Sequence, residues 1–328
     1  MALRKTGEFE RIDRIFAPLA QGLPGALDLL DDAAILSVGD GCELVVTTDT
    51  IVAGVHYVGD EPAELIAQKL LRVNLSDLAS MGARPIAYTL NIALPPDVGD
   101  EWLEAFARGL AADQQGFGLW LAGGDSVSTP GPVTLTITAM GEAPLKGALR
   151  RSGAGDRDVV YVTGTIGDGA LGLKAQRGEI EGLDANHRDA LIARYRRPEP
   201  RIECGLRLRG VATAAIDVSD GLVADLVHIA ATSGVAAVVQ AAAVPISDGA
   251  SAALQRDPSL WKSILGGGDD YELLFAAPEE ASDEIAAIAA DLGLPIKAIG
   301  RIETGRGVRV LDAEGAAMEI TRGGYTHR

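Results

Sequence analysis

The sequence predicts an α/β protein with two domains, and three observations support this prediction. Apolar runs typical of strands alternate with segments of helical periodicity along the whole chain. Glycine occurs 40 times in 328 residues, often at the turns between apolar runs. The stretch APLKGALRRSGAGDRD, residues 143–158, is rich in glycine and basic residues and poor in large apolar ones. It predicts a boundary between domains spanning 1–146 and 147–328.

The first domain begins with an amphipathic segment and then alternates strands with helices. The long apolar-periodic stretch of this domain starts at Pro62, and proline suits the first turn of a helix. In chain order, the pattern predicts a helix at 8–16, strands at 33–38 and 44–48, a helix at 62–81, a strand at 85–94, a helix at 101–114, and strands at 119–122 and 133–140.

The second domain resumes the alternation with the buried-strand pattern DVVYVTG. In chain order, we expect a strand at 158–164, helices at 170–177, 188–195 and 201–208, a strand at 213–217, a helix from 222, a strand at 272–278, a helix at 282–292, and strands at 296–302 and 308–311.

Composition and charge exclude several classes of protein. The formal net charge of -17 disfavours binding to nucleic acid or to anionic membranes. The two cysteines, Cys42 and Cys204, have no CxxC spacing, which argues against a disulfide framework or a zinc site. The start of the chain, MALRKTGEFERIDRIF, is charged, and no run of 18 apolar residues occurs. We therefore expect a soluble cytoplasmic protein.

Acidic residues recur at the predicted ends of apolar runs. Taken singly, each is best interpreted as a turn residue or a helix N-cap. Their recurrence in both domains suggests a ligand site, because ligand sites of α/β proteins gather at strand ends. The acids at such ends are Asp31, Asp32, Asp49, Asp125, Asp217, Asp220, Asp269 and Asp270.

Asp77 differs because it lies inside the predicted long helix. It continues the apolar stripe of Ile66, Leu70 and Val73, whereas the solvent face is predicted to carry Gln68, Lys69, Arg72, Ser76 and Ser80. A carboxylate directed inward must be paired, protonated or bound to a metal. A salt bridge to a buried arginine is one alternative, but the acids of the other segments favour a metal.

The oxygen donors and their charge point to magnesium and to phosphoryl transfer. Two carboxylates about 4 Å apart repel by roughly 4 kcal/mol at an effective dielectric near 20, and divalent cations remove that repulsion. Carboxylates, threonine hydroxyls and backbone carbonyls suit Mg²⁺ rather than Zn²⁺. Mg²⁺ held by a few carboxylates usually accompanies a phosphate substrate.

The common nucleotide-binding motifs do not occur in the sequence. There is no GxxxxGK[ST] and no protein-kinase catalytic loop, and the hydrolase motif GxSxG is also absent. The stretch GTIGDGALG, from Gly164, has its glycines in another spacing and is better interpreted as a tight structural turn. The four histidines show no metal-binding spacing, and only His56, which follows an acidic segment, is placed in a site.

Several segments, in this order, resemble those of the thiamine-monophosphate kinase family. Looser similarity extends to the wider superfamily of aminoimidazole ribonucleotide synthetase. The matching segments are GEFERIDRIF, DDAAIL, TTDTIVAGVHY, KLLRVNLSDLASMGARP, AGGDS, RRSGAGD, YVTGTIGDGALGL, RRPEPRI, AIDVSDGLVADLVHI and GGGDDYELLF.

The resemblance implies a fold and a reaction that periodicity does not supply. It implies two α/β domains with mixed sheets, a homodimer formed by the N-terminal domains through a shared β-barrel, and an active site in the cleft between domains. The implied reaction is direct in-line transfer of phosphate from ATP to thiamine monophosphate with several Mg²⁺ ions, which yields thiamine diphosphate.

The resemblance also implies roles for single residues. For catalysis, it implies Asp49, Asp77, Asp125, Asp217 and Asp220. For metal binding, it implies Asp32, Thr47, Thr48, Asp49, Asp77, Asp125, Asp217 and Asp220. For ATP, it implies Gly124, Asp125, Arg151 and Ser219. For the substrate, it implies His56, Asp269 and Arg322. Two positions depart from the family pattern: Asp269 replaces a glutamate, and Arg322 stands where the family often has a tryptophan.

Two other classes of function compete with a kinase. One is an ATP-dependent synthetase or maturation protein of the same superfamily. Selenophosphate synthetases carry a reactive cysteine near the N-terminus, where this chain has only Cys42, and the maturation proteins end in cysteine, whereas this chain ends GGYTHR. The other is a binding module for cations or nucleotides, which would not need Arg151 or the glycine-rich loops.

Overall fold

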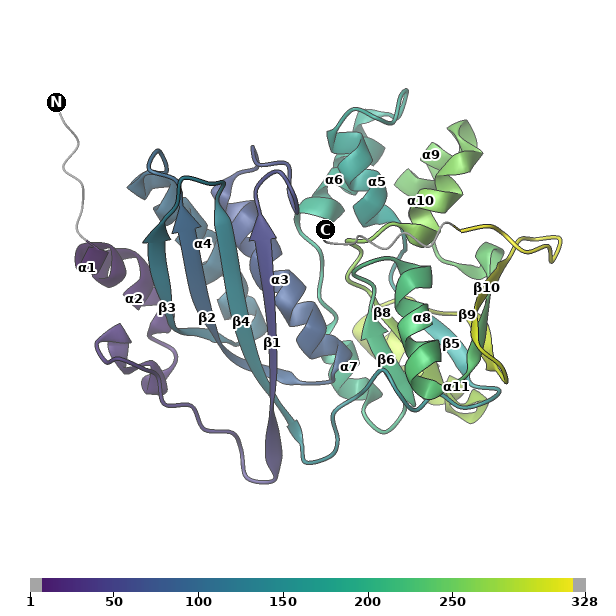
Figure 1. Cartoon of the computed structure of the whole chain (residues 1–328). Coiled ribbons are helices and arrows are strands. Elements are labelled where there is room, and N and C mark those ends of the chain that lie inside the picture. The colour runs from purple at the N-terminus through teal and green to yellow at the C-terminus, as the bar shows by residue number, and fades with distance from the viewer. Residues whose placement is uncertain (1–7, 321–328) are drawn as a thin grey trace. The chain divides into compact units, whose positions relative to one another are not determined.

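The computed structural model describes residues 8–320 of the chain (Figure 1). Their contacts divide the chain into two compact units. Unit 1 contains the described residues up to Leu78 together with Arg84–Lys146. Unit 2 contains Ala79–Ala83 together with the described residues from Gly147 onward.

Unit 1 is built on a four-stranded mixed sheet in the order β1-β4-β2-β3. Strand β4 pairs antiparallel with both β1 and β2, whereas β2 and β3 run parallel. The strands are β1 (Cys42–Val52), β2 (Arg84–Leu94), β3 (Trp120–Ser128) and β4 (Thr134–Pro144). All four were predicted, but β1 and β3 extend several residues past their predicted ends.

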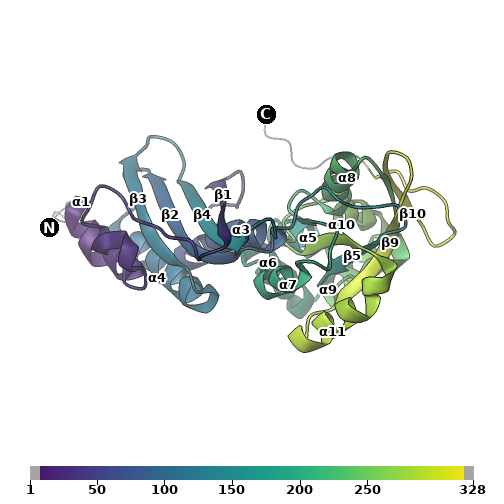
Figure 2. The same ribbon diagram turned by 90° about the horizontal axis from the view of Figure 1, so that it is seen from below.

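Two long helices cover one face of this sheet, as Figure 2 shows from below. They are α3 (Ala63–Ser80) and α4 (Asp100–Phe117), both predicted from their periodicity. Alternation along the strands produces this arrangement, since Leu135, Ile137 and Ala139 on β4 are completely buried. Among the described residues of unit 1, no element covers the other face, which we call the open face.

The N-terminal helical segment precedes the sheet and confirms the helix expected at 8–16. It consists of α1 (Glu8–Arg11), a π-helix (Ile12–Phe16), α2 (Ala17–Ala20) and a 3₁₀ segment (Pro24–Leu29). Arg11 and Arg14 attach it to α4 through ion pairs with Asp100, at 2.7 and 3.0 Å.

Two predictions for unit 1 are wrong. Residues 33–38 form no strand: Ile35 and Val38 are exposed, and no neighbouring strand pairs with them. The expected solvent face of α3 is also largely buried, because Gln68, Lys69, Ser76 and Ser80 are each at most 9% exposed. Part of this burial comes from α4, whose Asp113 accepts hydrogen bonds from Gln68 and Arg72.

Unit 2 holds a six-stranded mixed sheet in the order β10-β7-β9-β5-β8-β6. Neighbouring strands are antiparallel except β10 and β7, which run parallel. The strands are β5 (Val159–Thr163), β6 (Ala214–Asp217), β7 (Ala236–Gln240), β8 (Leu273–Ala277), β9 (Ile296–Glu303) and β10 (Gly307–Leu311). Of these, β7 was not predicted, although Gly234 marks the turn that precedes it.

The helices of unit 2 pack around this sheet. Helix α8 contacts β6, β7 and β10, while α11 contacts β9. The helices are α5 (Asp168–Gln176), α6 (Ala185–Arg196), α7 (Ile202–Leu208), α8 (Leu222–Ser233), α9 (Asp248–Arg256), α10 (Trp261–Gly266) and α11 (Ser282–Leu292). Sequence periodicity missed the short α9 and α10. No helix among the described residues is long and apolar enough to cross a membrane.

The five residues Ala79–Ala83 pack within unit 2. A Cβ atom at Gly205 on α7 would lie only 2.0 Å from the carbonyl oxygen of Ala79, so glycine is required for this contact. The amide of Leu149 donates to the carbonyl oxygen of Met81 at 2.9 Å. Although it precedes β2 in the sequence, this segment therefore belongs to unit 2.

Candidate active site

A polar group connects strand β1 to helix α3 in unit 1. Thr47 Oγ1 donates to Asp77 Oδ2 at 2.5 Å, and the amide of Asp49 donates to Asn74 Oδ1 at 3.1 Å. Burial, and then the negative charge of Asp77, raise the pKa of Asp49 to about 6. We call Thr47, Asp49 and Asp77 the β1 group. Thr47 and Asp49 lie in the middle of β1, not beyond the end of a strand as predicted, and Asp77 lies on α3.

Thr48 belongs to the opposite face of the same strand. Its hydroxyl donates to the carbonyl oxygen of Ile137 at 3.0 Å and accepts from Thr138 Oγ1 at 3.1 Å. Because successive side chains of a strand alternate, the hydroxyls of Thr47 and Thr48 point to different sides of the sheet. The structure therefore does not bring the Thr48 hydroxyl into the β1 group.

His56 is held by the loop that follows β1. The amide of Val52 donates to His56 Nδ1 at 3.1 Å, and the amide of His56 returns a hydrogen bond to the carbonyl oxygen of Val52 at 3.0 Å. Gly54, at φ 79°, makes the left-handed turn that closes this loop. Since Nδ1 accepts a hydrogen bond, the neutral ring carries its proton on Nε2.

Tyr57 is the neighbour of His56 and was not singled out from the sequence. Its side chain is buried, yet its hydroxyl has no hydrogen-bond partner among the described residues. Burial and the nearby Glu61 carboxylate raise the pKa of Tyr57, so the hydroxyl stays protonated and able to donate. A buried hydroxyl without a partner is costly, and this one lies beside a candidate substrate residue.

The second polar group of unit 1 lies on β3. Asp125 is exposed, and its Oδ1 accepts from the amide of Ser126 at 2.8 Å. The two preceding glycines differ in their surroundings. A Cβ atom at Gly124 would lie 1.9 Å from the carbonyl oxygen of Leu90, whereas one at Gly123 would meet nothing within 4 Å. Packing therefore requires glycine at position 124 but not at position 123.

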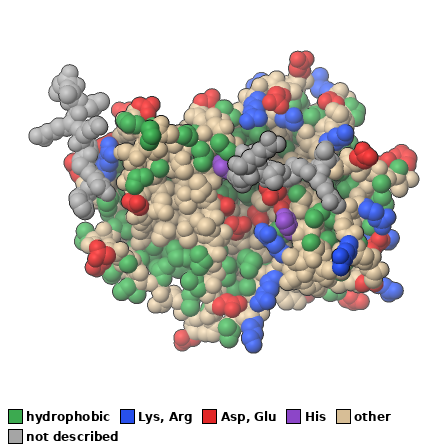
Figure 3. All heavy atoms as spheres, in the orientation of Figure 1, with side chains coloured by type: hydrophobic (Ala, Val, Ile, Leu, Met, Phe, Trp, Pro, Cys, Tyr) green, Lys and Arg blue, Asp and Glu red, His purple; other side chains and the backbone are tan. Residues whose placement is uncertain are grey.

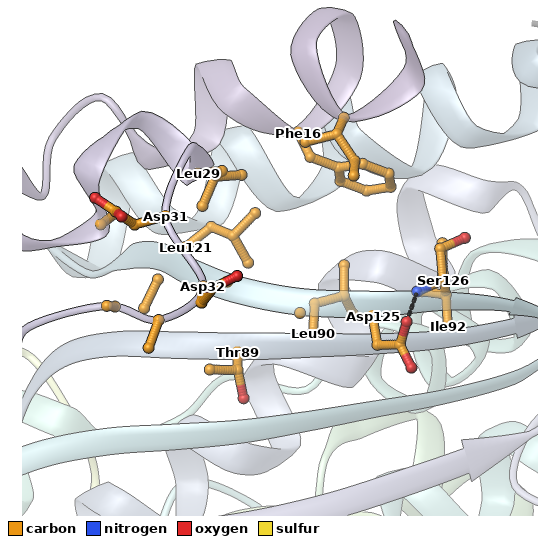
Figure 4. A pocket seen from close by; sticks show the side chains of 17 residues that line it. Phe16, Leu29, Asp31, Asp32, Thr89, Leu90, Ile92, Leu121, Asp125 and Ser126 are labelled. Atoms are coloured by element: carbon orange, nitrogen blue, oxygen red, sulfur yellow. Dashed lines mark hydrogen bonds between the residues drawn. The ribbon is translucent and has the colours of Figure 1, made fainter. Parts of the chain in front are cut away.

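A cavity of about 370 Å³ opens beside this part of β3 (Figure 4). Apolar side chains from the N-terminal segment and from β2 and β3 form most of its wall, and Asp32 and Asp125 both contribute to its lining. Leu27, Asp28 and Leu29, which precede Asp32, all have positive φ angles, an unusual conformation for non-glycine residues. The apolar wall includes Ile12, Phe16, Leu29, Leu90, Ile92 and Leu121.

In unit 2, a buried carboxylate shapes the turn that carries Ser219 and Asp220. Asp225 Oδ2 accepts from the amides of Ser219, Asp220 and Gly221 at 3.0 to 3.1 Å. Burial, and then the charge of Asp220, raise the pKa of Asp225 to about 7, although the three amide hydrogen bonds act in the opposite direction. Asp217, at the end of β6, is 2% exposed.

Asp269 belongs to a loop that is attached to the same turn. The amide of Asp269 donates to the carbonyl oxygen of Ser219, and the amide of Tyr271 donates to that of Val218. Both Asp269 and Tyr271 have positive φ angles, and Tyr271 Oη contacts Asp269 Oδ1 at 3.2 Å. These hydrogen bonds bring Asp269, Ser219 and Asp220 into one region of unit 2.

Asp270 occupies the glycine-rich turn that follows β5. Its carboxylate accepts from the amides of Gly167 and Gly169, at 2.7 and 2.9 Å, at the start of α5. This is the position that a phosphate takes at a helix N-terminus in nucleotide-binding loops. The hydrogen bonds support the interpretation of GTIGDGALG as a structural turn, because the protein's own carboxyl group takes the place of a phosphate.

The remaining predicted residues are less constrained. Arg151 is exposed, and its carbonyl oxygen accepts from Thr232 Oγ1 at 2.9 Å. Arg322 lies outside the described residues. Among residues 8–320, no three His, Cys, Asp or Glu side chains are grouped closely enough to hold a metal ion. The predicted metal ligands therefore remain a prediction.

Sequence reasoning missed the residues that support this site. Asn74 and Asp225 each fix a backbone segment that carries a candidate ligand. Asp270, noted from the sequence only among the acids at strand ends, instead fixes the turn at the start of α5. Asp270 stands beside a predicted residue, and Asp225 follows DVSDG by a few positions. That proximity was the available signal, but a side chain that reaches back to backbone amides leaves no periodic pattern.

Comparison with known proteins identifies the family to which the chain belongs. The family model "AIR synthase related protein, N-terminal domain" matches residues 30–143, and the corresponding C-terminal domain model matches residues 155–313. Together these matches cover more than half of the chain. The chain is a member of the AIR synthase related family, and its two-unit mixed α/β fold is the fold of that family.

Closer relatives narrow the assignment. The thiamine-monophosphate kinase of Caulobacter vibrioides is 43% identical over 323 residues, which are 98% of this chain and 90% of the relative. The crystal structure of thiamine-monophosphate kinase from Stenotrophomonas maltophilia aligns with a TM-score of 0.83 at 42% identity, covering 93% of this chain and 98% of the other. A structure of AaThiL complexed with AMPPCP and TMP aligns with a TM-score of 0.76 at 30% identity over 97% of both chains. Within the family, the chain belongs to the thiamine-monophosphate kinases.

Proposed function

We propose that this protein transfers the terminal phosphate of ATP to thiamine monophosphate and so forms thiamine diphosphate. The observation that carries the proposal is 43% identity to a thiamine-monophosphate kinase across 98% of the chain. The AaThiL structure, with AMPPCP and TMP bound, supports both substrates. The two polar groups of unit 1 and the Ser219–Asp220 turn of unit 2 provide the oxygen donors that such a reaction needs.

The cavity beside β3 supports the assignment of ATP. Its apolar wall suits the base of a nucleotide. Asp32 and Asp125 also line the cavity and would lie toward the charged phosphate end of the nucleotide. Gly124 and Asp125 are the residues that the family resemblance assigns to ATP. In unit 2, Ser219 and Arg151 are the matching candidates, with Arg151 offering a guanidinium to phosphate oxygens.

The residues present suit magnesium ions. Asp49 and Asp77 lie close enough for the charge of one to raise the pKa of the other, and a divalent cation would relieve that repulsion. Asp32, Thr47, Thr48, Asp49, Asp77, Asp125, Asp217 and Asp220 would hold the ions, all through oxygen atoms. When bound, Mg²⁺ neutralises the phosphate charge that develops during transfer.

The substrate side of the site would be formed by His56 and Asp269. The loop after β1 presents the Nε2–H of His56, while Tyr57 offers a buried hydroxyl without a partner. Asp269 is set by a strained loop, and its carboxylate suits the cationic thiazolium of thiamine monophosphate. Arg322 remains a candidate for the same substrate.

We also propose that two copies associate through unit 1, which serves as the dimerisation and metal-binding domain. Figure 3 shows the open face of its sheet, whose surface is mostly hydrophobic or uncharged. Leu44, Val46 and Val127 are each at least half exposed on its edge strands. Such a sheet face is usually covered, and a second copy can cover it symmetrically. Unit 2 would supply the remaining nucleotide and substrate residues.

The proposed function is tested by measuring ADP release from ATP and Mg²⁺ with thiamine monophosphate, free thiamine or formylglycinamidine ribonucleotide as acceptor. Mass spectrometry of the products should detect thiamine diphosphate only with the monophosphate. ADP formed with the ribonucleotide, or ATP turnover with none of the three, would assign the protein to another ATP-dependent reaction of the family.

A further inference from the structure

The loop that carries Asp269 has a strained backbone. Asp269 and Tyr271 have φ angles of 71° and 53°, in the left-handed region that favours glycine. This conformation costs free energy in a residue with a side chain, so it persists only where the surrounding structure holds it. Strain of this kind gathers at ligand sites. The contacts of this loop therefore bear on how Asp269 meets a ligand.

The start of the loop fits closely against two neighbouring backbone segments. The amide of Asp269 donates to the carbonyl oxygen of Ser219 at 2.9 Å. A Cβ atom at Gly268 would lie 2.1 Å from that same oxygen, and one at Gly169 would lie 2.3 Å from the carbonyl oxygen of Asp269. Glycine is therefore required at both positions, and the backbone of Asp269 is enclosed on two sides.

The end of the loop is anchored by a buried ion cluster. The Glu272 side chain is completely buried. Its carboxylate accepts two hydrogen bonds from Arg201, at 2.6 and 2.7 Å, one from Arg194 at 2.8 Å and one from Thr163 Oγ1 at 2.6 Å. A forked contact between an arginine and a carboxylate fixes direction as well as distance. Since Glu272 directly follows Tyr271, the cluster determines where the strained segment ends.

The ion cluster gives a role to the segment RRPEPRI, residues 196–202. This segment is one of those in which the chain resembles the thiamine-monophosphate kinases. Arg201 belongs to it, and the Arg201 side chain is only 17% exposed where it contacts Glu272. The segment therefore acts on the candidate site through the loop that carries Asp269.

The hydroxyl of Tyr271 holds the Asp269 side chain itself. Tyr271 Oη donates to Asp269 Oδ1 at 3.2 Å, and both residues are half-buried. The hydrogen bond restricts the rotation of the Asp269 side chain, on a backbone that is already fixed at both ends of the loop. The direction of the carboxylate is therefore set by the protein before any ligand binds.

We propose that Tyr271 and the Arg201–Glu272 pair are positioning residues for thiamine monophosphate: they orient the Asp269 carboxylate toward the cationic thiazolium ring. The pair fixes the backbone of the loop, and the Tyr271 hydroxyl fixes the side chain. A carboxylate that is already held in place binds a cation without a further loss of conformational entropy, so its orientation sets the affinity. This inference rests on the proposed kinase function, in which Asp269 binds the substrate.

The substitution Tyr271→Phe tests the role of the hydroxyl, because it keeps the ring and the fold. We expect the KM for thiamine monophosphate to rise by about three- to tenfold, as for the loss of one hydrogen bond, with kcat and the KM for ATP changed by less than about twofold. Tyr161→Phe is the matched control, since the Tyr161 ring stacks on Phe275 within the sheet, and it should change none of these values. An unchanged KM for thiamine monophosphate in Tyr271→Phe, or an equal rise in both KM values, would overturn the proposal.

A double-mutant cycle with Asp269→Gly shows whether Tyr271 acts through Asp269. Glycine suits the positive φ angle at this position and removes the side chain that is to be oriented. In the Asp269→Gly background, Tyr271→Phe should not weaken thiamine monophosphate binding further, as measured by calorimetric titration. A purely structural role would lower the affinity by the same factor in both backgrounds, and that additive result would exclude Tyr271 as a positioning residue.

The substitution Arg201→Lys tests the anchor, because lysine keeps the charge but cannot form the forked contact with Glu272. We expect the Kd of thiamine monophosphate to rise by about tenfold and the melting temperature to fall. In the Asp269→Gly background, the melting temperature should still fall while the Kd stays unchanged. A lower melting temperature without any change in Kd in the otherwise wild-type protein would limit the pair to stability. Wild-type protein that forms no thiamine diphosphate would instead contradict the proposed function, so the two failures are distinguishable.

Discussion

Thr47 and Asp77 are joined by a hydrogen bond of 2.5 Å that connects strand β1 to helix α3. Asp77 is partly buried and lies near Asp49, whose pKa is raised to about 6 by burial and by the charge of Asp77. Asp77 therefore places a second carboxyl group beside Asp49, at a position of the α3 stripe where an apolar side chain would be expected. In the proposed metal site, a bound cation would offset the repulsion within this pair.

The substitution Asp77→Asn should distinguish a role of Asp77 in metal binding from a role in stability. We expect turnover to fall by about 100-fold or more, because one charged group near the reacting phosphates is lost. The melting temperature of the ligand-free protein should be unchanged or higher, because Asp49 loses a repulsive neighbour. Asp97→Asn, at an exposed loop position, serves as the control. Full activity of Asp77→Asn would remove Asp77 from the metal site.

The geometry of His56 predicts different effects for two amide substitutions. The glutamine amide can reach the position of Nε2, whereas the asparagine amide reaches only the position of Nδ1, which accepts from Val52. We expect His56→Gln to keep the KM for thiamine monophosphate within a few-fold and His56→Asn to raise it by about tenfold or more, consistent with loss of one hydrogen bond. Steady-state kinetics would measure both KM values. A higher KM for His56→Gln than for His56→Asn would show that Nδ1 contacts the substrate.

Gly123 tests the nucleotide cavity, because a side chain at this position enters open space and not the protein. Gly123→Val should weaken ATP binding by at least about tenfold, with thiamine monophosphate binding unaffected. Gly116→Ala, at an open position of α4, is the matched control and should leave both unchanged. Calorimetric titration of each ligand, together with sedimentation to verify the oligomeric state, provides the measurement. Unchanged ATP affinity in Gly123→Val would exclude the cavity as the nucleotide site.

Asp270 predicts a pH dependence of stability. Burial raises the pKa of Asp270 well above its usual range, although the amides of Gly169 and Gly167 act against this rise. In the unfolded chain, an aspartate loses its proton near pH ~3.9. Between that pH and the raised pKa, the folded state holds a proton that the unfolded state has lost, so stability falls as pH rises.

The variant Asp270→Asn has no such proton to lose. It should melt at a lower temperature than the wild type at pH 5, because the amide accepts fewer hydrogen bonds from Gly167 and Gly169. We expect the difference in melting temperature to narrow as the pH is raised from 5 to 8. A difference that stays constant over this range would mean that the carboxylate is already ionised in the folded protein at pH 5.

Local patterns predicted most elements of the fold. Helices α3 and α4 and strands β2 and β4 follow directly from their hydrophobic periodicity. The strand expected at 33–38 failed because an apolar run forms a strand only where a neighbour pairs with it. Strand β7 was missed for the opposite reason, since its partners β9 and β10 come much later in the chain.

The candidate site depended on tertiary facts that a sequence does not contain. The acidic residues themselves were apparent, but strand order decides that Asp49 and Asp125 lie on opposite edges of one sheet. Alternation decides that Thr47 and Thr48 point to different faces. Both follow from pairing between distant segments, so neither could be derived from residue spacing.

The placement of Ala79–Ala83 within unit 2 bears on how the chain can be divided. A fragment that begins at Gly147 would lack the Ala79 carbonyl that packs against Gly205 and the Met81 carbonyl that binds Leu149. It would expose one side of α7 and leave a backbone amide without its acceptor. Limited proteolysis near residue 146 should therefore yield two pieces that stay associated. The polypeptide has two compact units, but it has no single peptide bond at which they can be separated intact.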